Sequence, residues 1–222
     1  MPLSAVLFDL DGTLLDTLAD VAEATNAALA QLGFPGHPAE AYKYFIGDGM
    51  EQLARRVLGP GPHDADLVAR CVERIRKEYA RCWDHKTRPY PGVPELLDQL
   101  TARQVPMAVL SNKPQEFTQL CVERLLGRWR FGAVVGAGGQ FPRKPHPAAA
   151  QHIARTLGLP PESIVYLGDT NTDMQTAVAA GMFPVGALWG FRTADELRTS
   201  GAQALVAHPM ELLTFLEDRQ PA

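Results

Sequence analysis

The stretch of sequence most informative about the fold is Ala5-Val6-Leu7-Phe8-Asp9-Leu10-Asp11-Gly12-Thr13. Its short apolar run, residues 5–8, ends abruptly in acidic residues, which are followed by a glycine and a hydroxyl residue. Apolar character that is continuous rather than alternating is typical of a strand buried on both faces of a parallel sheet. Further runs of this kind begin at Met107, Ala133, Ile164 and Val185. We therefore expect all five runs to be strands of one parallel sheet.

Segments with helical spacing of apolar residues separate these strands. They cover 94–103, 115–126, 147–157 and 172–180. Proline begins the first and third of them, and glycine follows the third and fourth, as is usual at helix ends. This alternation predicts an α/β protein whose sheet lies between two layers of helices, with right-handed crossovers.

One long segment breaks the alternation. Between residues 17 and 88 we find helical periods and expect no strand, with a third helix at about 66–83 and a Pro-Tyr-Pro-Gly turn just beyond the segment. The sequence therefore predicts a helical domain at 17–88 that is inserted after the first strand. The core would then consist of 1–16 and 89–222.

The composition excludes several classes of protein. The 222 residues include 21 Lys and Arg against 25 Asp and Glu, a net charge of −4, which argues against a nucleic-acid partner or a polybasic membrane partner. The apolar run before Asp9 is too short for a signal peptide, and the uncharged stretch 174–191 contains turn residues. Three cysteines without a C-x-x-C pair indicate a reducing compartment. We expect a cytoplasmic protein, monomer or homodimer, without a membrane partner.

Polar side chains follow the predicted strands and define a candidate site. They are Asp9, Asp11 and Thr13 after the first strand, Ser111 and Asn112 after the second, Lys144 after the third, and Asp169 with Asp173 after the fourth. Ligands of open α/β sheets bind beyond the carboxyl ends of the strands. Several carboxylates in one pocket need a compensating cation, and Mg²⁺ suits such oxygen ligands. The lysine and hydroxyl groups would hold a phosphate group.

The spacing of Asp9 and Asp11 suggests how such a site reacts. One carboxylate can attack phosphorus and form an aspartyl-phosphate. A second carboxyl group, two residues away, can donate a proton to the leaving alkoxide and later activate water. Taken singly, each of these residues is more often a turn residue, a helix cap or a solvated charge. Their recurrence at several strand ends favours the functional interpretation.

These motifs, in this order, resemble those of the haloacid dehalogenase superfamily, and within it the phosphoglycolate phosphatase group. The match rests on 6–14, Ser111, Lys144 and Gly168-Asp169 with Asp173, and on the Tyr90-Pro91-Gly92-Val93 and Lys144-Pro145-His146-Pro147 stretches. The resemblance implies a Rossmann-like α/β/α core with a small α-helical cap.

The resemblance also implies a role for each site residue. Asp9 would be the nucleophile and a magnesium ligand, and Asp11 the general acid/base that lends its backbone carbonyl to the metal. Asp169 would be the third ligand, supported by Asp173. Ser111 and Lys144 would bind the phosphoryl group, together with Thr13 and Asn112.

The expected substrate is a small organic phosphomonoester, with 2-phosphoglycolate first. We expect cap residues to select the leaving group, namely Lys43, Gly47, Gly49 and Arg55. The alternatives within the superfamily are a phosphomutase, a pyrophosphate hydrolase and a phosphonate hydrolase, the last of which needs a cap lysine (Lys43, Lys77 or Lys86) as a Schiff-base donor. A non-enzymatic receiver-type phospho-signalling module is the alternative of another class.

Overall fold

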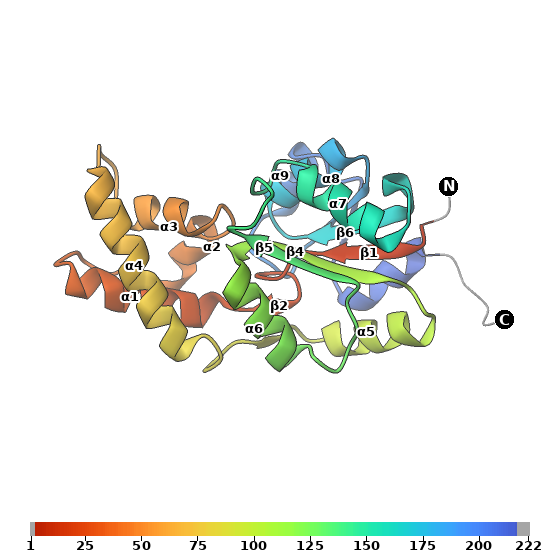
Figure 1. Ribbon diagram of the computed structural model, residues 1–222, viewed down its shortest axis with the longest axis horizontal. Helices are drawn as coiled ribbons and strands as arrows, with labels where there is room; N and C mark the ends of the chain where they lie inside the picture. Colours follow the sequence, from red (N-terminus) through yellow and green to blue (C-terminus); the bar gives the residue numbers. More distant parts are fainter. Residues whose placement is uncertain (1–2, 217–222) are drawn as a thin grey trace.

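The computed structural model describes residues 3–216 and is built on a six-stranded sheet of strand order β5-β4-β1-β6-β7-β8 (Figure 1). Every neighbouring pair in it is parallel. The strands are β1 Ala5–Phe8, β4 Met107–Pro114, β5 Ala133–Ala137, β6 Ile164–Gly168, β7 Phe183–Ala187 and β8 Ala204–Val206. The predicted α/β fold with a parallel sheet is confirmed.

Strand β1 lies in the interior of the sheet and is completely buried. Phe8 stands in register with Val109 of β4 on one side and Leu167 of β6 on the other. The chain adds β4 and β5 on one side of β1 and then returns to add β6 to β8 on the other. Asp9 therefore leaves the sheet where the strand order reverses, which is where open α/β sheets bind their ligands.

Helices cover both faces of the sheet (Figure 1). Val6 and Phe8 belong to the apolar cluster under α5 (Val93–Ala102) and α6 (Gln115–Leu125), together with the 3-10 helix η3 (Pro209–Phe215). Ala5 and Leu7 belong to the cluster under α7 (Ala148–Leu157) and α8 (Asn171–Ala180). Successive strand residues thus supply opposite layers of the core, as the two-residue period of a strand requires. Helix α9 (Ala194–Thr199) packs against β7 and α8.

A separate group of helices, here called the helical unit, stands beside the sheet (Figure 1). It comprises α1 Leu18–Gln31, η1 Ala39–Ala41, α2 Tyr42–Phe45, α3 Met50–Val57 and α4 Ala65–Cys82. Its helices share an apolar cluster, which includes buried side chains such as Leu29, Tyr42 and Ile75 and which Phe117 and Phe191 of the core also join. All of its elements lie within the predicted insertion.

Three details differ from the expectations. The expectation of no strand between 17 and 88 is wrong at its last residue, because β3 (Arg88–Pro89) pairs antiparallel with β2 (Leu15–Asp16). Two-residue strands show no alternation by which a sequence could reveal them. Strand β4 does not end at Leu110 but continues to Pro114, which pairs with Ala137 of β5 after an irregularity in the register. The strand β8 was not predicted.

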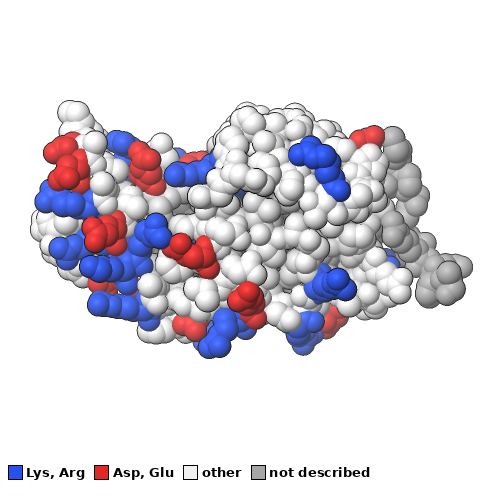
Figure 2. All heavy atoms as spheres, in the orientation of Figure 1, with Lys and Arg blue, Asp and Glu red and all other residues white. Residues whose placement is uncertain are grey.

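Charges and cysteines agree with the composition. On the face shown in Figure 2, basic and acidic residues intermingle over the helical unit rather than gathering by sign. Cys71, Cys82 and Cys121 are all free. Within residues 3–216, the structure contains no helix long and apolar enough to cross a membrane.

Candidate active site

Three buried aspartates meet at the carboxyl ends of the central strands. Asp9 follows β1, Asp169 follows β6, and Asp173 lies in the first turn of α8. One carboxylate oxygen of each lies within 4.8 Å of the others. Asp9 is 5% exposed, and Asp169 and Asp173 are fully buried. The prediction brought these three residues together from two separate segments of the chain, and the structure does the same.

Asp169 accepts hydrogen bonds from the loop after β1 and from the loop after β7. Thr13 Oγ1 donates to its Oδ1 at 2.8 Å, and the backbone N–H of Phe191 donates to its Oδ2 at 2.8 Å. Burial and the charge of Asp173 raise the pKa of Asp169 to about 7, although these two hydrogen bonds act in the opposite direction. The carboxylate is thus fixed in position but lacks enough compensating positive charge.

Lys144 supplies part of that charge from the loop after β5. Its Nζ lies 2.8 Å from Asp9 Oδ1 and 2.6 Å from Asp173 Oδ1, and it donates to the backbone carbonyl of Leu110 at 3.2 Å. Burial disfavours the charged ammonium, but Asp173 and Asp9 outweigh it and raise the pKa of Lys144 above its usual range. The pKa of Asp9 is raised as well, by burial and by Asp173, against the opposing effect of Lys144.

The cluster fits a hard divalent cation. Three carboxylates face one ammonium, and Asp9 Oδ1 is buried without a directed hydrogen bond despite its ion pair with Lys144. Carboxylate oxygens in this number are the ligands that Mg²⁺ takes alongside water and substrate oxygens. A cation would relieve the repulsion that raises the pKa values of Asp9 and Asp169.

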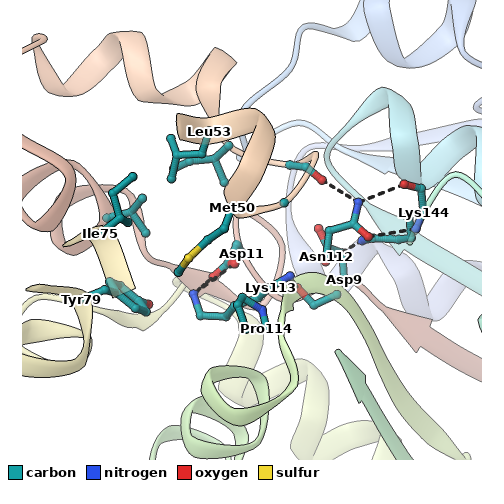
Figure 3. A pocket seen from close by; sticks show the side chains of 15 residues that line it. Asp9, Asp11, Met50, Leu53, Ile75, Tyr79, Asn112, Lys113, Pro114 and Lys144 are labelled. Carbon is teal, nitrogen blue, oxygen red and sulfur yellow. Dashed lines mark hydrogen bonds and ion pairs between the residues drawn. The ribbon is translucent and has the colours of Figure 1, made fainter. Parts of the chain in front are cut away.

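Asp11 faces away from this cluster and is paired with Lys113, a residue to which the sequence analysis gave no role. Lys113 Nζ lies 2.8 Å and 3.1 Å from the two carboxylate oxygens of Asp11 (Figure 3). It also lies 4.6 Å from the centre of the Tyr79 ring. Burial opposes the charge of Lys113, but Asp11 outweighs it and the pKa of Lys113 is raised. Its position directly after Ser111 and Asn112 is the feature of the sequence that could have indicated a place in the site.

Asn112 connects Lys144 to the helical unit. Its Oδ1 accepts from the backbone N–H of Lys144 at 2.9 Å, and its Nδ2 donates to the carbonyls of Lys144 at 3.1 Å and Gly47 at 2.9 Å. Both ends of the Asn112 amide are therefore engaged by protein groups. Ser111 Oγ accepts from the backbone N–H of Lys113 at 3.2 Å and keeps its own proton available for a ligand.

A second core residue reaches the helical unit from the loop after β7. The guanidinium of Arg192, 9% exposed, donates to the carbonyls of Lys43 and Ile46. Nearer the surface, Arg76 of α4 pairs with Glu116 of α6. Together with Asn112, these contacts hold the helical unit over the strand ends, and the sequence offered no local pattern that pairs them.

A cavity of about 60 Å³ lies between the strand ends and the helical unit (Figure 3). Its lining includes the candidate residues Asp9, Asp11, Ser111, Asn112, Lys144, Gly47 and Gly49. Of the predicted leaving-group selectors, Lys43 instead pairs with Glu40 at 2.8 Å, and Arg55 pairs with Glu51 at 2.9 Å beside a neighbouring groove. The structure therefore brings the two glycines to the cavity and keeps these two cations outside it.

Gly12 is required where the chain passes Asp169. Its φ is +90°, and a Cβ there would collide with the Asp169 carboxylate, whereas Gly33 has φ +79° and no atom within 4 Å of such a Cβ. We expect Gly12→Ala to lower the free energy of unfolding by about 3 kcal/mol or more, and Gly33→Ala by about 1 kcal/mol, the cost of backbone strain alone. Urea unfolding of both variants measures the difference, and equal losses would show that Gly12 does not pack against Asp169 as described.

The comparisons with known proteins agree with this geometry. The sequence profile of the family described as "Haloacid dehalogenase-like hydrolase" matches residues 6–187. The phosphoglycolate phosphatase of Nitrosospira multiformis is 33% identical over 98% of this chain and 97% of its own length, and that of Yersinia pseudotuberculosis is 32% identical over 94% and 90%. A crystal structure from Lactobacillus delbrueckii subsp. bulgaricus, described as a phosphoglycolate phosphatase, superimposes with a TM-score of 0.89 at 34% identity, covering 96% of this chain and 97% of its own.

The parallel sheet and the acidic cluster with its lysine suit phosphate chemistry, and the family match places the chain among the hydrolases. The chain belongs to the haloacid dehalogenase-like hydrolase family. The resemblance inferred from the sequence is thereby confirmed, and so is the predicted enzyme class, a phosphoric monoester hydrolase.

Proposed function

We propose that this enzyme is a Mg²⁺-dependent phosphatase that hydrolyses a small phosphomonoester, with 2-phosphoglycolate as the first candidate. The observation that supports it most is the meeting of Asp9, Asp169 and Asp173 around one buried ammonium, Lys144. Such a cluster suits a phosphoryl group and a cation together, because the carboxylates can bind the cation while the ammonium binds the negatively charged phosphoryl oxygens. The names of the relatives support the choice of substrate.

In this proposal Asp9 is the nucleophile and Asp11 is the general acid and base. Asp9 attacks phosphorus, the bond to the leaving oxygen breaks, and the phosphoryl group stays on Asp9 as an aspartyl-phosphate. Asp11 protonates the leaving alkoxide and then takes a proton from the water that releases phosphate. Lys144 and Ser111 orient the phosphoryl oxygens, whereas the hydroxyl of Thr13 donates to Asp169 and holds that carboxylate in place. Mg²⁺, bound by Asp9, Asp169 and the backbone carbonyl of Asp11, with Asp173 supporting, would neutralise their charge.

The structure disfavours two of the alternatives. A phosphonate hydrolase needs a cap lysine in the site, but Lys43, Lys77 and Lys86 each pair with a glutamate outside the cavity. A receiver module is expected to lack a helical insertion, whereas in this chain a helical unit covers the acidic pocket. A phosphomutase and a pyrophosphate hydrolase would share the same acids, and the substrate panel below separates them.

Three expectations of organisation belong to this proposal. The division into a core of 1–16 and 89–222 and a cap of 17–88 is supported by the apolar cluster of the helical unit, to which the core adds only Phe117 and Phe191 among the buried residues. A cytoplasmic location is supported by the three free cysteines. The protein would act as a monomer or homodimer on a small phosphate ester.

The test is phosphate release from 2-phosphoglycolate beside sugar phosphates, nucleotides, pyrophosphate and phosphonoacetaldehyde. With Mg²⁺ we expect the highest kcat/KM for 2-phosphoglycolate, and with excess chelator we expect release to fall to the level of the Asp9→Asn blank. A peak at another ester would replace the substrate and keep the chemistry. Full activity under chelation would refute the role of the metal.

A further inference from the structure

We propose that Lys113 binds a carboxylate on the leaving group of the substrate and so makes the enzyme selective for short acidic phosphomonoesters. This inference rests on the proposed phosphatase function and concerns the part of the site that the phosphoryl group does not fill. It assigns to a core residue the selection that the sequence led us to expect from cap residues such as Lys43 and Arg55.

The first support is the distribution of charge around the cavity. Among the described residues that line it, the cations are Lys113 and Lys144. Lys144 is engaged by Asp9, Asp173 and the Leu110 carbonyl on the phosphate side. Of the two lining cations, Lys113 is thus the one left for an anionic leaving group, while Arg143 lines the adjoining groove and comes close to Gly49.

The second support is the character of the opposite wall. The helical unit contributes apolar side chains to the cavity, among them Val21, Ile46, Leu53 and Ile75 (the last two shown in Figure 3), all of which are buried. A carboxylate placed against this wall without a partner would lose its hydration at a large cost in free energy.

The third support is the distance between Lys113 and the proposed proton donor. Lys113 Nζ lies 2.8 Å from Asp11 Oδ1, and Asp11 must come within hydrogen-bond reach of the ester oxygen to protonate it. In 2-phosphoglycolate the carboxyl carbon is only two bonds from that oxygen. An ammonium has three N–H donors, so Lys113 can accept a second carboxylate without leaving Asp11.

A matched pair of substrates tests the assignment. 2-Phosphoglycolate and 2-hydroxyethyl phosphate have the same chain length, but only the first carries a carboxylate. Because Lys113 also contacts Asp11, Lys113→Met should slow both esters, but we expect it to lower kcat/KM for 2-phosphoglycolate by on the order of 100-fold more than that for 2-hydroxyethyl phosphate. Lys113→Arg should keep the preference, and Lys77→Met, an exposed lysine paired with Glu73, should change neither substrate.

Equal losses on both substrates would overturn the assignment, because Lys113 would then act only through Asp11; so would no loss on either. Thermal unfolding checks that each variant is folded, and Lys113→Gln replaces Lys113→Met if the latter is not.

A binding measurement separates this inference from the proposed function. In Asp9→Asn with Mg²⁺, calorimetry should show tighter binding of 2-phosphoglycolate than of 2-hydroxyethyl phosphate, and the difference should vanish in Asp9→Asn/Lys113→Met. If the wild-type enzyme hydrolyses no ester of the substrate panel, the proposed function fails, while this difference in affinity still supports Lys113. Equal affinity for the two esters, or no binding of either, would refute the role of Lys113.

Discussion

Replacing Asp9 by asparagine is expected to lower phosphate release by on the order of 10⁴-fold or more, because an amide is a poor nucleophile and removal of a nucleophile has effects of this size. The surrounding fold should persist, since asparagine has the same shape and β1 is buried in the sheet. Initial rates with saturating substrate and Mg²⁺ measure the effect. Release within tenfold of the wild type would contradict the role of Asp9.

The same variant has a signature that does not depend on activity. Folding raises the pKa of Asp9, so its ionised form opposes folding at neutral pH, and a neutral amide removes that penalty. Without metal, the Tm of Asp9→Asn at pH 7.5 should equal or exceed that of the wild type. Mg²⁺ should raise the Tm of the wild type more than that of Asp9→Asn, because a ligand that binds the folded state stabilises it and the variant lacks one of the proposed metal ligands. An equal shift in both proteins would argue against Asp9 as a ligand.

Replacing Lys144 by methionine is expected to have the largest effect on stability. The side chain is 2% exposed and contacts the carboxylates of Asp9 and Asp173, which would then lie buried together without it. Removing one partner of a buried ion pair costs about 3–5 kcal/mol, because the other charge is left uncompensated. We expect the urea midpoint in metal-free buffer to fall accordingly, and phosphate release to fall by on the order of 10²-fold or more.

Lys77→Met provides the matched control for this measurement. Lys77 lies on the exposed face of α4, and its Nζ is 3.8 Å from a carboxylate oxygen of Glu73. Exposed pairs of this kind contribute about 0–1 kcal/mol, so the variant should unfold close to the wild type. If Lys144→Met unfolds at the same urea concentration as this control, the ammonium does not stabilise the acidic cluster.

The acidic cluster could be predicted because it follows from the topology. Asp9 and Asp169 directly follow apolar runs, and parallel strands bring their carboxyl ends to one edge whatever the side chains do. Lys144 could be assigned through the order of the motifs. The positions of these residues are set by the path of the backbone, and the hydrophobic pattern of the sequence predicts that path.

The remaining features depend on how two distant surfaces meet. The pairing of Lys113 with Asp11, and the contacts of Asn112 and Arg192 with the helical unit, arise from docking of the unit on the sheet. No periodicity in the sequence encodes that docking. Lys43 and Arg55 show the converse, because the glutamates three and four residues before them already indicated local pairing on the surface.

The short ribbon of β2 and β3 has a consequence for how such enzymes can diversify. Leu15 stands opposite Pro89 and Asp16 opposite Arg88, so the chain leaves the core and returns to it at the same place. The segment between Asp16 and Arg88 therefore behaves as a loop whose two ends are held together by this ribbon. Doubling the length of a loop costs only about 0.6 kcal/mol in closure entropy. Another set of helices could be grafted onto this ribbon while the acids at the strand ends keep their positions.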